Sequence, residues 1–246
     1  MSPVPTITLA GHVLNDLFAI TDVSRPLPPA RVQTVDVPGR DGTLVTGRTL
    51  GPRRVELRLW RDVGTSRAGM LDAMRDLAVW LQSDATVPLT FSDEAGRIRR
   101  VTLDGDLPLD EYERAGCATL SLLQPDPICD LGAPRSATVP SAGSVSFLVG
   151  GTAPCGISVH ASSAIRDSST KLWGLRFDDR YYLRVALGTG AKSVDIDCAT
   201  RAVAVAGATS MITLESDWPE LSPGRHTVRM DLGSGAATLR WQERSL

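Results

Sequence analysis

The sequence predicts a mainly β fold, and three observations carry this prediction. Residues 55–60 alternate Val, Leu and Leu with Glu, Arg and Trp, the period of two that marks a strand with one buried face. Beyond residue 143, short alternating runs are separated by turn residues at roughly the 8–12-residue interval of a β-sandwich. Only residues 66–82 show a convincing helical period.

Bulk composition indicates a globular chain. Its 246 residues are 42% apolar and 22% charged, with a net charge of −2, so nothing points to nucleic acid or an anionic membrane as a ligand. From residues 1–16 we expect no secretory signal, and no run approaches the ~20 apolar residues of a membrane span. The four cysteines show no C-x-x-C spacing, and we interpret them as small buried hydrophobes made in a reducing cytosol.

The first part of the chain predicts short strands around proline- and glycine-rich breaks. We expect strands at residues 6–10, 13–20, 31–37 and 55–62. Pro26, Pro28 and Pro29 indicate an exposed arm or turn, because proline cannot donate to a strand ladder. The Pro-Gly-Arg-Asp-Gly run at residues 38–42 predicts a turn, and a loop containing Gly47 follows.

The next segment predicts a helix, a hairpin and a closing strand. In residues 66–82 the apolar positions Met70, Leu71, Met74, Leu77, Ala78 and Leu81 form one stripe. Thr65 or Ser66 can cap its first amides. We expect hairpin strands at residues 89–91 and 98–103 and a further strand at 118–123.

A boundary between two domains is expected near residue 132. Residues 131–143 are small, polar and rich in Pro and Gly, which favours a linker, so we predict domains at residues 1–132 and 133–246. The second domain is expected to be all β. Its predicted strands are residues 145–149, 157–161, 172–177, 181–187, 193–198, 202–205, 211–214, 227–232 and 237–241.

The sequence offers no catalytic, cofactor-binding or metal-binding constellation, so we predict a protein that is not an enzyme. The three histidines lie far apart, and Gly188-Thr189-Gly190 lacks the strand and helix of a dinucleotide site. The acidic pairs are interpreted as loop acids or solvated strand faces: Asp178 with Asp179, Asp195 with Asp197, and Glu111 with Glu113.

Aromatic side chains of the second domain allow one binding hypothesis. Exposed Trp and Tyr can stack on sugar rings, while the alternative is packing in a core or an interface. The candidates for contact with a sugar or a partner are Trp173, Tyr181, Tyr182 and Trp218.

Three segments resemble the distal tail proteins of long-tailed, siphovirus-type bacteriophages. Val-Pro-Gly-Arg-Asp-Gly at residues 37–42, with the strand 54–60 after it, is similar to an early V-x-G-R-D-G signature of that family. Leu-Leu-Gln-Pro-Asp-Pro at 122–127 resembles the segment that closes the family's N-terminal domain. Residues 218–226 resemble the L-x-P-G-x-N ending of its C-terminal domain, with His226 where Asn is frequent.

The resemblance implies a structural role at the phage tail tip. Residues 1–132 would be a ring-forming β-sandwich carrying the helix, and residues 133–246 an outward-facing, galectin-like β-sandwich. Six copies would form a ring that joins the tail tube protein above to the tail hub protein below, with receptor-binding proteins as further candidate partners. The protein would be assembled in the bacterial host cytoplasm and remain in the virion, with no cofactor and no membrane insertion.

The charge of the first domain is compatible with a DNA channel through such a ring. Residues 1–132 hold 14 Arg against 18 Asp and Glu, a net charge of −4. DNA would pass such a lumen without specific binding, because acidic walls repel phosphates whereas basic walls bind them.

The expected contacts between subunits lie in the loop at residues 39–54 and on the outward face of the strand that follows. A long arginine-rich ribbon left unpaired is an aggregation hazard, so a partner should cover it. The candidate interface residues are Gly39, Arg40, Asp41, Gly42, Arg53, Arg54, Glu56, Arg58 and Trp60.

Two other functions remain open from the sequence. A carbohydrate-binding module that adheres to the host surface would use the aromatics named above. A hydrolase of the host envelope would need a cluster of His, Glu, Asp or Cys, and none is evident in the sequence.

Overall fold

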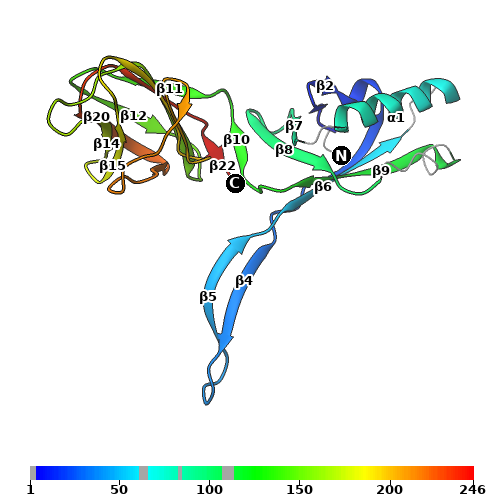
Figure 1. Cartoon of the computed structure of the whole chain (residues 1–246). Coiled ribbons are helices and arrows are strands. Elements are labelled where there is room, and N and C mark those ends of the chain that lie inside the picture. The colour runs from blue at the N-terminus through cyan, green and yellow to red at the C-terminus, as the bar shows by residue number, and fades with distance from the viewer. Residues whose placement is uncertain (1–3, 61–65, 83–84, 107–113) are drawn as a thin grey trace. The chain divides into compact units, whose positions relative to one another are not determined.

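The computed structural model describes residues 4–60, 66–82, 85–106 and 114–246 (Figure 1). The chain divides into two compact units, Met1–Cys129 and Asp130–Leu246. Strands dominate both units, which confirms the predicted mainly β fold, and the helix α1 spans Arg67–Leu81. Among the described residues, no helix is both long and apolar enough to cross a membrane.

The N-terminal unit is a bent sheet in which one strand takes part in two half-sheets. Its strands are β1 (Ile7–Leu9), β2 (His12–Val13), β3 (Ala19–Ser24), β6 (Arg53–Trp60), β7 (Val87–Phe91), β8 (Arg97–Leu103) and β9 (Cys117–Gln124), in the spatial order β2-β1-β7-β8-β9-β6-β3. The first part of β8 pairs with β7, as in Val101 with Val87, and its end pairs with β9, as in Thr102 with Leu123. Strands that change sheet in this way make the corners of a closed β core.

Strand β6 lies between β9 and the edge strand β3, and it follows the predicted alternation. Val55, Leu57 and Leu59 are at most 1% exposed, while the side chains between them face outward. The residues of α1 that complete the core are Ala73, Met74, Leu77 and Leu81. Ser66 caps the helix, because its Oγ accepts the Gly69 amide at 3.1 Å. The stripe prediction was wrong at Ala78, which is exposed because it lies one position beyond Leu77, at the solvent edge of the stripe.

One predicted strand is interrupted. The expected strand at residues 13–20 contains the 3₁₀ turn η1 (Leu14–Asp16), and β3 begins only at Ala19. The side chain of Asn15 explains the break, because its Oδ1 accepts the Ile7 amide at 2.7 Å and competes with strand pairing.

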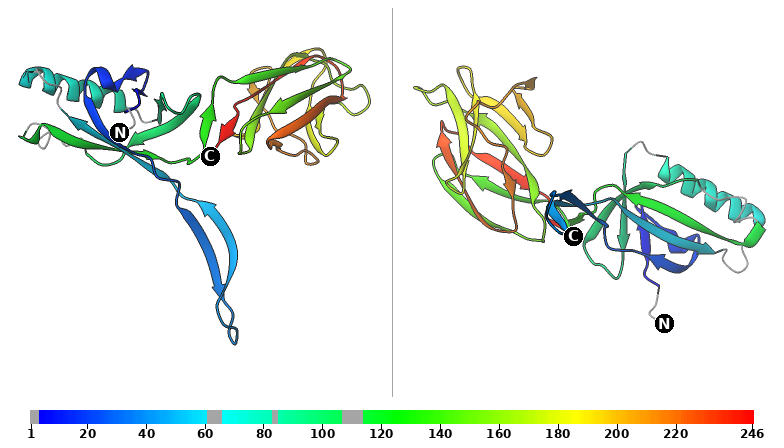
Figure 2. Two further views of the ribbon diagram at one scale, coloured as in Figure 1. Left: turned by 180° about the vertical axis from the view of Figure 1, so that it is seen from behind. Right: turned by 90° about the horizontal axis from the view of Figure 1, so that it is seen from below.

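The expected loop after residue 42 is instead half of a long hairpin. Strands β4 (Ala30–Asp36) and β5 (Thr43–Leu50) pair from Ala30↔Leu50 to Asp36↔Thr43, with a shift in register that leaves Thr46 unpaired beside Gly47. From the sequence we expect Gly47 to lie in a loop, but it lies at a β-bulge inside β5, a position at which glycine is also common. The hairpin, which we call the arm, is a separate two-stranded sheet that runs away from the rest of its unit in the views of Figures 1 and 2.

The C-terminal unit is a β-sandwich. One sheet has the order β11-β21-β13-β16-β17-β18 with β19 beside β13, and the other has the order β12-β20-β14-β15. The strands are β11 (Arg135–Val139), β12 (Ser144–Val149), β13 (Cys155–Ala164), β14 (Leu172–Phe177), β15 (Tyr181–Ala186), β16 (Lys192–Asp197), β17 (Ala202–Val205), β18 (Ala208–Thr209), β19 (Glu220–Leu221), β20 (Gly224–Leu232) and β21 (Ala237–Trp241). The core combines residues of both sheets, such as Val159 and Leu239 from one and Leu175 and Val228 from the other.

Two predictions for this unit were wrong. The segment expected as a linker, residues 131–143, starts at the last residue of β10 (Cys129–Leu131) and contains β11, which pairs with β21 from Arg135↔Trp241 to Val139↔Ala237. The strand expected at residues 211–214 is an extended loop with one isolated bridge, Ile212 to Val185. The first prediction failed because proline and glycine residues flank β11, and such residues are typical of linkers. The second failed because residues 211–214 are mostly apolar, as in a short strand. The short strands β18, β19 and β22 (Arg244–Ser245) were not predicted.

The cysteines behave as small apolar residues. Cys129, Cys155 and Cys198 are buried, Cys117 is half-buried, and none of the four forms a disulfide. Burial raises the pKa of the Cys155 thiol to about 11 and that of Cys198 to about 12, so both stay protonated at neutral pH.

Candidate functional site

The tip of the arm is the predicted Pro-Gly-Arg-Asp-Gly turn. Gly39 and Gly42 have positive φ angles of 78° and 80°, which other residues adopt only at a cost, and the Arg40 amide donates to the Val37 carbonyl at 3.1 Å. Asp41 is exposed together with these three residues. The four candidate interface residues of the turn therefore stand together at the far end of the hairpin.

Both faces of the arm expose aliphatic side chains. Val35 lies opposite Leu44 on one face and these residues are 50% and 46% exposed, while Val32 (51%) and Val45 (61%) lie on the other face. An isolated two-stranded hairpin is marginally stable in water, and aliphatic residues on both faces favour a partner that covers them. Sequence reasoning missed Leu44 and Val45, because the run Thr43–Leu50 does not alternate in hydropathy.

The remaining candidate interface residues lie on β6, but not all on one face. Arg54, Glu56, Arg58 and Trp60 point outward, whereas Arg53 is only 7% exposed. The Arg58 guanidinium lies 5.8 Å from the centroid of the Trp60 ring, and Arg54 forms an ion pair with Asp104 at 2.5 Å. The outward stripe of β6 therefore consists of Arg54, Glu56, Arg58 and Trp60. Arg53 points inward and makes contacts within its own unit.

Arg53 belongs to a cluster of arginines at the base of the arm. Its Nη2 donates to the backbone carbonyl of Arg25 at 3.0 Å, so the residues just before and just after the arm are joined. The amide of Gly51 adds a second link, donating to the Pro29 carbonyl at 2.7 Å. Burial lowers the pKa of the Arg53 guanidinium, and the neighbouring charge of Arg99 lowers it further.

Carboxylates and an aromatic ring hold the other two arginines of this cluster. Arg25 forms two hydrogen bonds to Asp93, at 2.6 and 2.9 Å, and one to Glu94, and buried Arg99 also pairs with Glu94. The guanidinium groups of Arg25 and Arg99 lie 4.6 and 5.1 Å from the centroid of the Phe91 ring. The cluster fixes where the arm leaves the sheet. Its partners come from β7, β8 and the turn between them, which are distant in the chain, so no local pattern predicts the cluster.

Replacing Asp93 by Asn is expected to destabilise the N-terminal unit at neutral pH. The hydrogen bond from Arg25 lowers the pKa of the Asp93 carboxyl, so its contribution is present above the unfolded value of about 3.9 and is lost as pH falls through the lower folded pKa. Urea unfolding of both proteins should give a stability difference that shrinks toward pH ~2. Asp72→Asn, in an exposed pair with Arg75, is the control without effect, and a D93N difference that persists in acid would contradict the assignment.

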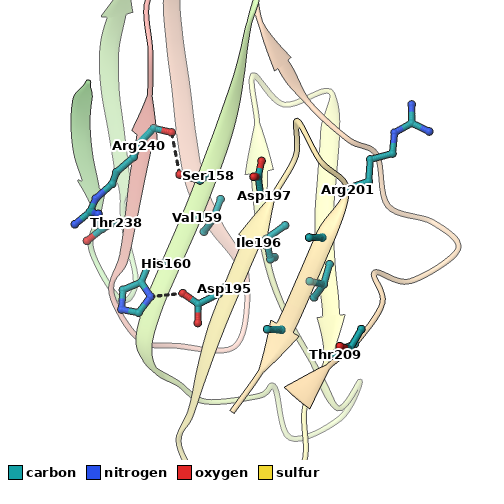
Figure 3. Close-up of a pocket in the computed structure, with 14 residues that line it drawn as sticks. Ser158, Val159, His160, Asp195, Ile196, Asp197, Arg201, Thr209, Thr238 and Arg240 are labelled. Carbon is teal, nitrogen blue, oxygen red and sulfur yellow. Dashed lines mark hydrogen bonds and ion pairs between the residues drawn. The ribbon is translucent and has the colours of Figure 1, made fainter. Parts of the chain in front are cut away.

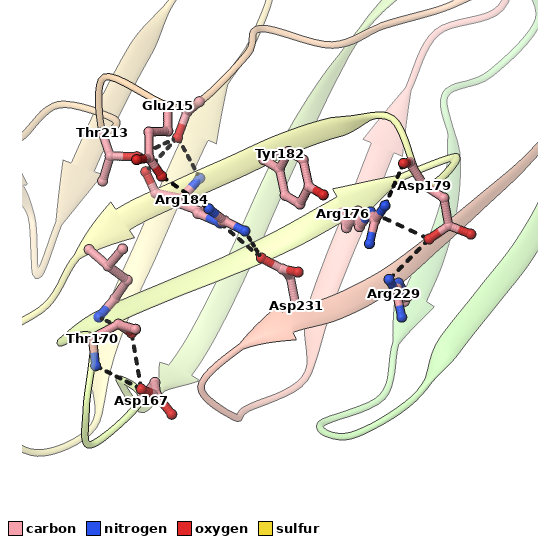
Figure 4. Close-up of polar contacts among 12 residues, drawn as sticks. Asp167, Thr170, Arg176, Asp179, Tyr182, Arg184, Thr213, Glu215, Arg229 and Asp231 are labelled. Atoms are coloured by element: carbon pink, nitrogen blue, oxygen red, sulfur yellow. Dashed lines mark hydrogen bonds and ion pairs between the residues drawn. The ribbon is translucent and has the colours of Figure 1, made fainter.

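The structure separates the four candidate aromatics of the second domain. Trp173 is fully buried in the core, so its assignment as a sugar or partner contact was wrong, because β14 turns it inward. Tyr182 lies under the guanidinium groups of Arg176 and Arg184, 4.9 and 4.3 Å from its ring centroid (Figure 4). Only Tyr181 and Trp218 line a common pocket.

The surroundings of Tyr182 form a fixed polar network, not an open binding surface. Arg184 binds Asp231 at 2.7 and 2.8 Å and Glu215 at 3.4 Å, which ties β15 to β20 and to the loop before β19 (Figure 4). Beside it, Asp179 pairs with Arg229 at 3.1 Å. A sugar stacking on Tyr182 would have to displace arginines that carboxylates already hold.

A hollow of about 510 Å³ lies on the outer face of the sheet that contains β13 and β16 (Figure 3). His160 Nδ1 and Asp195 Oδ1 are 2.6 Å apart within it, and both side chains are about half exposed. Ser158 points its hydroxyl at the Arg240 carbonyl, 3.4 Å away, and not at the histidine. These contacts do not build the nucleophile and base pair of a hydrolase.

The other acidic pairs also have structural partners. Asp178 binds His226, and Asp197 accepts the amides of Ala199 and Thr200 in a turn. Glu111 and Glu113 lie outside the described residues. No group of three or more His, Cys, Asp or Glu side chains suited to a metal ion occurs within the described ranges.

Each of the two units matches a known protein family. The family described as phage tail protein RIFT-related domain matches residues 8–124, and the family described as siphovirus-type tail component, C-terminal domain, matches residues 150–244. No curated protein sequence matches the chain.

Solved structures share the fold over nearly the whole chain. The Dit protein (gp 19.1) of SPP1, described as a paradigm of the hub adsorption apparatus in phages infecting Gram-positive bacteria, has 19% identity and a TM-score of 0.75, with 99% of this chain and 100% of that chain covered. Chains of the phage P2 baseplate in its activated conformation, with Ca and with Sr, have 10% and 11% identity and TM-scores of 0.53 and 0.51. In both, 98% of each chain is covered.

The two matching families describe a phage tail protein domain and a siphovirus-type tail component, which identifies this chain as a structural component of a phage tail. The two family matches together span most of its length. The chain belongs to the siphovirus-type distal tail proteins.

Proposed function

We propose that six copies of this protein form a ring at the tail tip that joins the tail tube to the tail hub and leaves a channel for DNA. The chain is a tail component by family, and similar folds occur in proteins described as parts of a hub adsorption apparatus and a baseplate. The tail tube protein lies above the ring, the hub protein lies below it, and receptor-binding proteins attach around it. Its role is structural, without catalysis.

The exposed arm is the observation that supports assembly. Its strands pair only with each other among the described residues, and it carries aliphatic side chains on both faces. In a closed ring each subunit meets the next through two different surfaces, so a projecting element of one copy can lie on the sheet of its neighbour. We assign the outward stripe of β6 (Arg54, Glu56, Arg58 and Trp60) as part of the surface that receives it.

The net charge of residues 1–132, −4, suits a ring through which DNA slides. In this arrangement residues 1–132 build the ring and residues 133–246 form the outward-facing, galectin-like domain. Assembly takes place in the host cytoplasm, and the ring remains in the virion.

Light scattering of the purified protein, with negative-stain images of the same peak, tests the proposal. A species of six subunits, seen as a ring with an open centre, is the expected result. A monomer at every concentration would contradict self-assembly. A purified protein that also fails to join tail tubes mixed with it would contradict the ring altogether.

A further inference from the structure

The C-terminal unit contains a second pocket, of about 540 Å³, between the β14–β15 turn and the segment that leads into β20. Tyr181 and Trp218 supply its aromatic surface, and Arg180, Asp217 and Glu220 supply charged groups. Asp178 and Asp179 form the turn with positive φ angles of 49° and 55°, which places Arg180 and Tyr181 at the pocket. All of these residues belong to the C-terminal unit.

A hydrogen-bond network around buried His226 fixes the wall of this pocket. His226, 7% exposed, has its Nδ1 2.6 Å from Asp178 Oδ2 and its Nε2 2.7 Å from the Ser222 carbonyl. The other oxygen of Asp178 accepts the Thr227 amide at 2.8 Å. Both side chains are therefore occupied in holding the turn and the β20 segment together, and the pocket is formed before any ligand arrives.

The remaining groups match the chemistry of a sugar ring. Trp218 and Tyr181 are partly exposed, and such rings pack on the apolar C–H face of a pyranose while polar groups around them bind its hydroxyls. The Arg180 guanidinium lies 5.0 Å from the centroid of the Tyr181 ring, which places a hydrogen-bond donor beside the aromatic surface. Asp217 and Glu220 are exposed acceptors beside it.

The charges that line the pocket distinguish neutral or amine-bearing saccharides from acidic ones. Three carboxylates, Asp178, Asp217 and Glu220, line the pocket with one guanidinium, Arg180, so carboxylates are in excess even when His226 is counted as a cation. The excess of carboxylate favours hydroxyl or ammonium groups and opposes carboxylates or phosphates on a ligand.

We propose that this pocket is a binding site for a neutral or amine-bearing saccharide. The site lies in the unit that does not contain the arm, and it adds recognition of a glycan to the ring role without depending on it.

Titration calorimetry of the full chain with three tetrasaccharides tests the site: N-acetylglucosamine, glucosamine and galacturonic acid tetramers. The first two are expected to bind and the third to be excluded. Trp218→Ala should weaken both by about tenfold, since it removes the aromatic platform. Glu220→Lys should weaken the glucosamine tetramer more than the N-acetylated one, because it adds a positive charge beside the ammonium groups.

Arg201→Ala, which alters the hollow on the β13–β16 sheet instead, is the matched control and should leave every affinity unchanged. Trp218 also packs against the core, so circular dichroism must show that W218A is folded; exposed Glu220 gives an independent variant. The proposal is overturned if none of the tetramers binds at about 10 mM, if galacturonate alone binds, or if Arg201→Ala abolishes binding while Glu220→Lys does not.

Discussion

Shortening the arm is expected to leave the protein folded but unable to form a ring. Replacing residues 33–47 by Asn-Gly joins Val32 and Arg48, which are directly paired, through a two-residue hairpin turn. The change removes Val35, Leu44 and Val45 from the surface and keeps the links at the arm's base. Light scattering should then show only the mass of a monomer.

A milder variant separates the apolar contacts of the arm from its length. Val35→Ser with Leu44→Ser removes one aliphatic cross-strand pair and should weaken ring formation, while Thr34→Ser on the opposite face should not. Rings of normal mass from the shortened protein would refute the arm's role in assembly.

Charge reversal tests the two ends of the candidate interface together. Arg40 is at the arm's tip and Arg54 is at the start of the outward stripe of β6. Arg40→Glu combined with Arg54→Glu should prevent ring formation. Ring formation by this double variant would show that the interface lies elsewhere.

Trp173→Ala is expected to destabilise the C-terminal unit by about 3–5 kcal/mol, because Trp173 is fully buried and its loss leaves a large cavity. A domain has a total stability of about 5–15 kcal/mol, so the variant should melt at a much lower temperature or fail to fold. Its indole Nε1 has no hydrogen-bond partner in the described structure, so the loss is one of packing. Calorimetry of the full chain measures the shift in the transition of this unit.

Two further variants make the tryptophan result specific. Trp173→Phe keeps an aromatic ring in the core and should cost less than the alanine change. Leu214→Ala removes a fully exposed side chain and should change stability by no more than about 0.5 kcal/mol. A loss below about 1 kcal/mol for W173A would contradict the packing of this core.

Local patterns predicted the regular elements well. The alternation of Val55, Leu57 and Leu59 identified β6, and the helical stripe with Ser66 as its cap identified α1 within one residue at each end. In both elements one face is buried, so apolar residues recur with the period of the element, which is two residues in a strand and 3.6 in a helix. The family resemblance rested on turns such as residues 37–42, whose glycines the backbone requires.

Features that depend on distant partners could not be predicted. Thr43–Leu50 has no buried face, so no period marks it as a strand; only its pairing with β4 defines it. Arg25, Glu94 and Arg99 meet because β3 and the β7–β8 turn come together in space. The sequence does not distinguish Trp173 from Tyr181 as a binding candidate. In the structure β14 places Trp173 in the core, whereas Tyr181 is partly exposed.

The join between the arm and the sheet has a mechanical consequence. Both ends of the arm continue into neighbouring strands, through Arg25 into β3 and through Arg53 into β6, and β6 is itself paired with β9 from Arg53↔Gln124 to Trp60↔Cys117. Ladder hydrogen bonds lie perpendicular to the strands, so tension along the arm shears every rung at once instead of opening them one by one. A subunit held by its arm would therefore transmit a pull from its neighbour into β3 and β6 of its own sheet, where the eight-residue pairing of β6 with β9 resists rupture.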